Sequence, residues 1–215
     1  MVKKFLLSSL LLVIVGSISF VRIAAAYDVG GHAVETYNCG TSCDTSSAVD
    51  AVDNTGNFVD ELVNTLGYNN IYERYNCSAE ENDFVGADSN YVDNVDIAYF
   101  CGHGDVNGIK FGTENSYCTC PLSRMELGDG DLAWLILDSC QVLNYTYIVY
   151  QSHWPNSTFK GLHMIFGHDT EASASAYRGR KFARYADGYY GTADKLVTAS
   201  INWLINYRIK TNQGG

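Results

Sequence analysis

The sequence predicts an α/β domain in which helices flank a mainly parallel central sheet. Three short apolar runs, at residues 95–101, 132–137 and 161–166, end at glycine or polar residues, as buried parallel strands commonly do. Amphipathic helical patterns at 46–66 and 173–186 are interspersed with these runs. Strands that alternate with helices in this way are typical of a parallel sheet with helical crossovers.

The remaining expected elements are shorter. The helix at 46–66 has Ser46 or Ser47 available as its capping residue and Gly67 as its stop. The other expected elements are strands at 33–37 and 71–75, a helical turn near 80–85, a small hairpin at 108–113, a polar loop at 114–130 and a last helix that begins at Thr192.

Residues 1–26 have the form of a secretory signal peptide. Two lysines near the start precede an apolar run, and Ala24 and Ala26 give the small-residue pattern of a cleavage site. An uncleaved anchor is the alternative. After cleavage we expect no membrane span, and residues 27–215 are expected to form one domain because no Pro-rich or Gly/Ser-rich linker divides them. The mature protein is therefore expected to be secreted or at the cell surface.

The charge balance argues against binding to nucleic acid. The chain has 14 basic and 24 acidic side chains, a formal net charge of −10, and three of the basic residues lie in residues 1–26. The mature domain is consequently more acidic than the whole chain. A surface of that sign repels phosphate backbones and anionic membranes.

The cysteine content agrees with export. All seven cysteines lie after residue 26, and in an oxidising compartment most of them should pair. Since seven is odd, at least one is expected to stay free or to bond another chain. The disulfide candidates are Cys39, Cys43, Cys77, Cys101, Cys118 and Cys120. Three sequons offer candidate glycosylation sites at Asn76, Asn144 and Asn156.

The residues that follow the apolar runs carry the candidate chemistry, because ligands of such sheets bind at the carboxyl ends of the strands. His103 follows one run and Cys140 follows another. If the two strands are neighbours, the imidazole meets the thiol and favours a thiolate–imidazolium pair. The backbone amides of Gly104 and Cys140 would then serve as oxyanion donors.

Four further residues are candidates for lining the same cleft. Asp138 either orients the imidazole or caps the following helix, and Asp105 either lines the cleft or forms a turn. Gln141 directly follows Cys140, and His168 follows the run at 161–166, where a turn role is the alternative.

The two strand-end motifs resemble those of the caspase–metacaspase–gingipain superfamily of cysteine peptidases. The matching stretches are Tyr99-Phe-Cys-Gly-His-Gly104 and Leu135-Ile-Leu-Asp-Ser-Cys140. A wider likeness to uncharacterised secreted proteins of that fold covers about residues 45–205. The resemblance implies a three-layer caspase-like fold and a catalytic dyad, with His103 as base and Cys140 as nucleophile, that cleaves peptide bonds in a peptide or protein substrate.

Two alternatives to the enzyme remain open. Cys140 is either bonded to Cys101 or an inert buried thiol in a protein that keeps the fold without the activity. Val142 stands where metacaspases have a glycine two residues after the cysteine, which favours this option. Such a protein would act as a secreted structural or surface-assembly subunit, and self-association would fit that role.

No cofactor is expected. Cys101, His103, Cys140 and His168 lack the close ligand spacing of zinc sites, so no metal site is assigned. The acidic residues at 80–96 and 128–131 could attract calcium, although they lack the ligand spacing of an EF-hand loop. Solvated acidic loops are the simpler interpretation.

Overall fold

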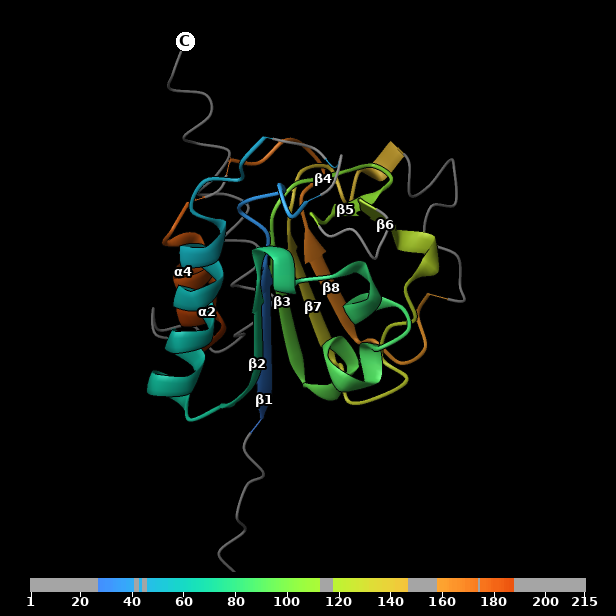
Figure 1. The fold of residues 1–215 in the computed structure, drawn as a ribbon. Helices are drawn as coiled ribbons and strands as arrows, with labels where there is room; N and C mark the ends of the chain where they lie inside the picture. The colour runs from blue at the N-terminus through green and yellow to red at the C-terminus, as the bar shows by residue number, and fades with distance from the viewer. Residues whose placement is uncertain are drawn as a thin grey trace, which may run out of the picture.

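The centre of the molecule is a five-stranded sheet in which all neighbouring strands are parallel (Figure 1). The computed structural model describes residues 27–40, 43, 46–112, 118–146, 158–173 and 175–187. The strand order is β2-β1-β3-β7-β8. The strands are β1 (Asp28–Ala33), β2 (Asn69–Tyr75), β3 (Ile97–Cys101), β7 (Trp134–Asp138) and β8 (Met164–Gly167). The predicted α/β class with a mainly parallel sheet is confirmed.

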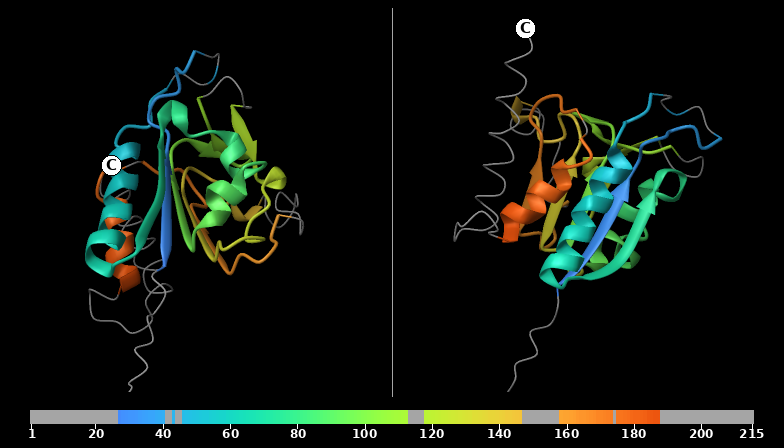
Figure 2. Two further views of the ribbon diagram at one scale, coloured as in Figure 1. Left: turned by 60° about the horizontal axis from the view of Figure 1, so that its bottom comes forward. Right: turned by 90° about the vertical axis from the view of Figure 1, so that its left-hand side faces the viewer.

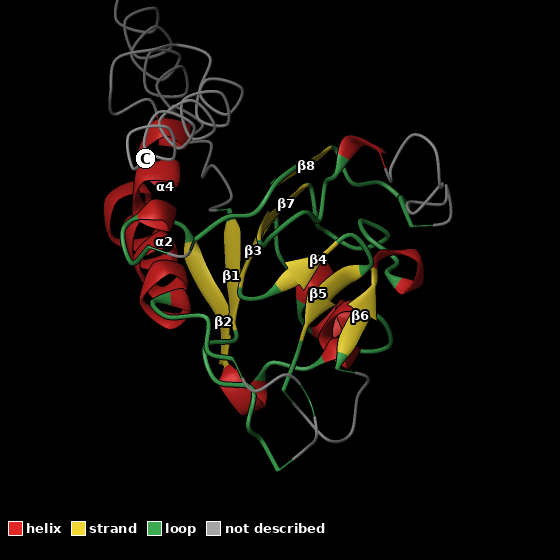
Figure 3. Cartoon of the chain, turned by 90° about the horizontal axis from the view of Figure 1, so that it is seen from above, coloured by secondary structure: helices red, strands yellow, loops and turns green. Residues whose placement is uncertain are grey.

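The sheet separates two different layers. Helices α2 (Ala51–Leu66) and α4 (Arg178–Asp187) lie side by side on one face (Figure 2). The other face carries short 3-10 helices and a small antiparallel sheet (Figure 3). These elements are η1 (Asn76–Ser78), η2 (Glu81–Phe84), η3 (Asp88–Asn90), η4 (Val92–Asn94), η5 (Leu122–Arg124), β4 (Gly104–Asp105), β5 (Gly108–Lys110) and β6 (Thr119–Pro121).

The first strand lies earlier than the sequence indicates. We expected it at 33–37, but β1 is Asp28–Ala33 and contains Gly30 and Gly31. Glycine weakens the local strand signal, yet helix α2 requires it here. A Cβ on Gly31 would lie 2.6 Å from Cγ2 of Thr55 on that helix. The close approach of helix and strand therefore explains both the glycine and the wrong prediction.

Two further expectations needed correction. Helix α2 begins at Ala51 rather than near Ser46, although it ends at Leu66 with Gly67 as its C-cap, as predicted. The segment 114–130 was expected to be a loop, but it contains β6 and η5. Strand β6 pairs with β5, and a strand of only three residues in a polar stretch leaves little signal in the sequence.

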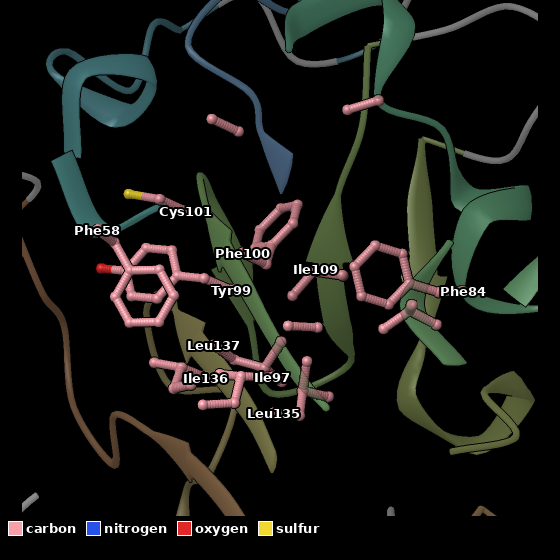
Figure 4. Packing of buried hydrophobic residues seen from close by; sticks show 14 of the residues in the cluster. Phe58, Phe84, Ile97, Tyr99, Phe100, Cys101, Ile109, Leu135, Ile136 and Leu137 are labelled. Carbon is pink, nitrogen blue, oxygen red and sulfur yellow. The ribbon is translucent and has the colours of Figure 1, made fainter. Parts of the chain in front are cut away.

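Aromatic side chains fill the core on both faces of β3. Tyr99 stacks on Phe58 of α2, with ring centroids 4.4 Å apart, and Cys101 lies on the same face (Figure 4). Phe100 points to the other face and meets Phe84 of η2 edge-on at 5.9 Å. The alternation of side chains along a strand thus makes β3 the support for both layers.

Four of the seven cysteines form disulfides. Cys39 is bonded to Cys77, and Cys43 is bonded to Cys118. Cys101 and Cys120 were also disulfide candidates, but both are buried free thiols. Each lies within the packed core and forms no disulfide with another cysteine of the described residues. The expected Cys101–Cys140 alternative is therefore absent.

Some expectations fall on residues outside the described ranges. They are the signal peptide at 1–26, the sequon at Asn156 and the helix from Thr192. Within the described ranges, no helix has the length and apolar character needed to cross a membrane. The two disulfides are compatible with an oxidising compartment.

Candidate functional site

The sheet order brings the two predicted catalytic residues to one edge. Strands β3 and β7 are parallel neighbours, so His103 and Cys140 both follow strand ends at the carboxyl edge of the sheet. The chains remain in contact beyond the strands, because Ser139 Oγ donates a hydrogen bond of 3.0 Å to the Gly102 carbonyl. A Cβ on Gly104 would lie 2.8 Å from Cβ of Ser139. Glycine at 104 therefore allows the turn after β3 to lie against the turn that carries Cys140.

The imidazole of His103 is held by the loop that follows β1. Its Nε2 lies 3.0 Å from Ser46 Oγ. Its ring stacks on Tyr37, with centroids 5.1 Å apart, and its backbone N–H donates to the Tyr37 hydroxyl. Sequence reasoning missed both partners. Ser46 is 57 residues from His103, and the sequence pattern indicated only a helix cap there.

The thiol of Cys140 forms no disulfide and is half-buried. Its Sγ lies 3.3 Å from both the amide nitrogen and the carbonyl oxygen of Ala172. The next residue, Gln141, has φ of 55°, a left-handed conformation that non-glycine residues rarely adopt. The hydrogen bonds of Cys140 thus go to Ala172, and in the described part of the chain none joins Cys140 to His103.

Asp138 is a buried charge beneath the site rather than a cleft residue or a helix cap. Its carboxylate accepts hydrogen bonds from Asn54 Nδ2 at 2.7 Å and the Tyr99 hydroxyl at 2.9 Å. Arg178 of α4 forms an ion pair with it, and His168 Nε2 lies 2.9 Å from its Oδ1. Burial alone would raise the pKa of Asp138, but the His168 hydrogen bond and the Arg178 charge lower that pKa to about 2.

His168 and Asp105 also differ from the cleft residues that we expected. His168 is only 6% exposed and its imidazole faces Asp138, so it belongs to the buried charge cluster. Asp105 Oδ1 accepts the Asn107 N–H at 2.7 Å, and its Oδ2 lies 3.4 Å from Lys110 Nζ. This geometry matches the turn role that was the alternative for Asp105.

Two of the three sequons lie in the described ranges, and their asparagines have structural contacts. Asn76 Oδ1 accepts the N–H groups of Glu35 and Thr36 at 2.9 and 3.0 Å. Asn144 Nδ2, the atom that would carry a glycan, donates to the Asp169 carbonyl at 2.9 Å. Glycosylation at both positions stays a prediction.

The acidic segments that we considered for calcium come together in space. Asp88, Asp93 and Asp129 each place a carboxyl oxygen within 4.8 Å of the others, and such a set could hold a hard cation. Burial and the neighbouring Asp129 carboxyl raise the pKa of Asp93 to about 7. The Gly128 N–H donates a bifurcated hydrogen bond to the two carboxylate oxygens of Asp93, at 2.9 and 3.1 Å, so the cluster also has a structural role.

A family model described as "Domain of unknown function (DUF6345)" matches residues 32–211. The chain belongs to this family. No curated protein and no solved structure matches the chain. The DUF6345 match includes His103, Cys140 and the buried charge cluster, so these features lie within the family domain.

The DUF6345 domain thus combines a half-buried thiol and an imidazole at one sheet edge, with a satisfied buried carboxylate below them. A thiol in such a place can act as a nucleophile and an imidazole can act as its base. Cys101 and Cys120 are buried and are poor candidates for a nucleophile. Burial raises the pKa of both thiols, and nearby Asp138 and Glu81 respectively raise them further.

Proposed function

We propose that this protein is a secreted or cell-surface cysteine peptidase in which Cys140 is the nucleophile and His103 the general base. The observation that carries the proposal is the placement of both residues at the carboxyl ends of the neighbouring parallel strands β3 and β7, with Cys140 unbonded. The two disulfides support an oxidising compartment. The likeness to the caspase–metacaspase–gingipain superfamily agrees with this arrangement.

The proposed reaction is acyl transfer to sulfur followed by hydrolysis. The Cys140 thiol loses its proton to His103, and the sulfur attacks the carbonyl carbon of a peptide bond. His103 then gives the proton to the leaving amine as the C–N bond breaks. Water hydrolyses the resulting thioester and regenerates the thiol. In this proposal the oxyanion is stabilised by the backbone N–H of Gly104 and, once its hydrogen bond to the Thr170 carbonyl is broken, by that of Gln141.

The first prediction concerns the two proposed catalytic residues. Protein without residues 1–26 is incubated with a mixed peptide library, and new N-termini are identified by mass spectrometry. Cys140→Ala and His103→Ala should each lower cleavage by at least about 10³-fold, since each removes a group that acts in the transition state. Cys120→Ala, which alters a buried thiol that the proposed mechanism does not use, is the matched control. Cleavage that persists in Cys140→Ala contradicts the proposed mechanism.

A non-enzymatic scaffold is the second candidate, and one observation favours it. The His103 imidazole bonds Ser46 and the Cys140 thiol bonds Ala172, so the two groups engage other partners. A scaffold of this kind would assemble with a second copy or another surface protein. Analytical ultracentrifugation of the secreted protein, together with a Cys140 thiol that stays unreactive until denaturation, would support this candidate over the peptidase.

A further inference from the structure

Residues 169–173, which we call the strap, lie between β8 and α4 and pack against the turn that carries Cys140. Tyr145 donates its N–H to Asp169 Oδ1 at 2.8 Å, and Asn144 Nδ2 donates to the Asp169 carbonyl. These two bonds fix the start of the strap. The proposed reaction does not use the strap, yet among the described residues the strap provides the hydrogen-bond partner of the Cys140 thiol.

The strap occupies two groups that a peptide substrate would need. The Gln141 N–H, next to the nucleophile, donates to the Thr170 carbonyl at 3.0 Å. The Cys140 thiol donates to the Ala172 carbonyl and accepts the Ala172 N–H, both at 3.3 Å. A carbonyl on the amide beside the nucleophile is the arrangement in which acyl-transfer enzymes hold their substrates. Main-chain groups of the strap therefore stand in for substrate main-chain groups.

The contact with Ala172 also occupies the sulfur itself. Both the carbonyl oxygen and the amide nitrogen of Ala172 lie 3.3 Å from Cys140 Sγ. A substrate carbonyl that approaches the sulfur must take the place of these groups, so the attack needs the strap to move away.

We propose that the strap is an internal, substrate-like inhibitor that keeps Cys140 latent until residues 169–173 move. Its regulatory meaning rests on the peptidase function proposed above. The contacts of the strap with Cys140 and Gln141 are made by its main-chain atoms. Displacement by an extended peptide, or by a partner that binds the exposed Asp169 and Glu171, would then open the site.

The test measures how fast iodoacetamide alkylates Cys140 in the native protein, read by mass spectrometry. Asp169→Ala removes the carboxylate that accepts the Tyr145 N–H and should raise the rate about tenfold or more, since a bond to a charged group is lost. Asp60→Ala, at an exposed position of α2, is the matched control and should leave the rate unchanged. Equal rates of Cys140 alkylation in Asp169→Ala and in the control would contradict the proposed inhibitory role of the strap.

A second pair of variants distinguishes release of the strap from a folding defect. Ala172→Pro removes the N–H that bonds the sulfur, whereas Ala172→Gly keeps it, so alkylation should be faster in the proline variant. Circular dichroism confirms that each variant is folded. Faster alkylation without any Cys140-dependent peptide cleavage supports the inhibitory role of the strap and contradicts the peptidase function. Cleavage that depends on Cys140 but is unchanged in both strap variants supports the peptidase function and contradicts the inhibitory role of the strap.

Discussion

Asp138 and Arg178 form an ion pair that is almost fully removed from solvent. Such a pair is costly to bury, and it persists because Asn54, Tyr99 and His168 supply the remaining contacts of the carboxylate. The cluster ties α4 and α2 to the end of β7, directly before Cys140. Its main effect on the site is to fix the backbone from which the turn with Cys140 begins.

Asp138→Asn should lower the free energy of unfolding by about 3–5 kcal/mol at pH 7, because it leaves the Arg178 charge buried without a counter-charge. The pKa of Asp138 is lowered to about 2, so its contribution is present above about pH 4 and is lost as the pH falls towards 2. Urea unfolding at several pH values measures both effects. Asp60→Asn serves as the exposed control, and equal stability of the two variants at pH 7 would contradict the assigned role.

The individual side-chain contacts of the site could not be predicted from the sequence. The order and spacing of the motifs predicted that His103 and Cys140 share an edge, because strand ends are visible as glycine and polar residues after apolar runs. The bonds of His103 to Ser46 and of Asp138 to Arg178 join residues 57 and 40 positions apart. No local pattern encodes pairings over such separations.

Helix α2 and strand β1 approach each other more closely than side chains larger than glycine would allow. Thr55 and Val59 of the helix face Gly31, and Thr55 Oγ1 donates to the His32 carbonyl at 3.2 Å. The Thr55 side chain is thereby held in place against the strand. Apolar periodicity predicted the helix and its C-terminal end but not its start at Ala51, whereas the two glycines concealed the strand on which it packs.

Gly31→Ala should destabilise the protein by about 1–3 kcal/mol, because the new Cβ would lie 2.6 Å from Thr55 Cγ2. Gly56→Ala lies on the same helix, and its Cβ would meet only the Tyr75 hydroxyl at 3.5 Å. That change should stabilise the helix by about 0.5–1 kcal/mol. If the packing is as described, the midpoint temperatures of thermal unfolding shift in opposite directions in Gly31→Ala and Gly56→Ala. A stabilising effect of Gly31→Ala would contradict the close packing of α2 on β1.

At the scale of the whole molecule, the two disulfides tie one loop to distant parts of the chain. Cys39 and Cys43 lie in the loop after β1, and their partners Cys77 and Cys118 follow β2 and precede β6. The same loop provides Tyr37 and Ser46, which hold His103. The sequence predicted disulfides from composition, but connectivity depends on which strands are neighbours.

Replacement of both Cys43 and Cys118 by alanine should lower the free energy of unfolding by about 4 kcal/mol, since the closed loop spans 75 residues. Urea unfolding of the oxidised proteins measures this loss. Cys120→Ala removes a thiol without opening a loop, so its effect should be smaller. A double variant no less stable than Cys120→Ala would show that Cys43 and Cys118 are not bonded.

The ion pair of Asp138 with Arg178 also limits when the protein can finish folding during its synthesis. A ribosome releases β7 well before α4, so a nascent chain that stops between them carries the Asp138 carboxylate without its cation. Packing of β7 would then enclose an uncompensated charge. Final packing of the sheet around Asp138 is therefore expected only after the chain has been made as far as α4.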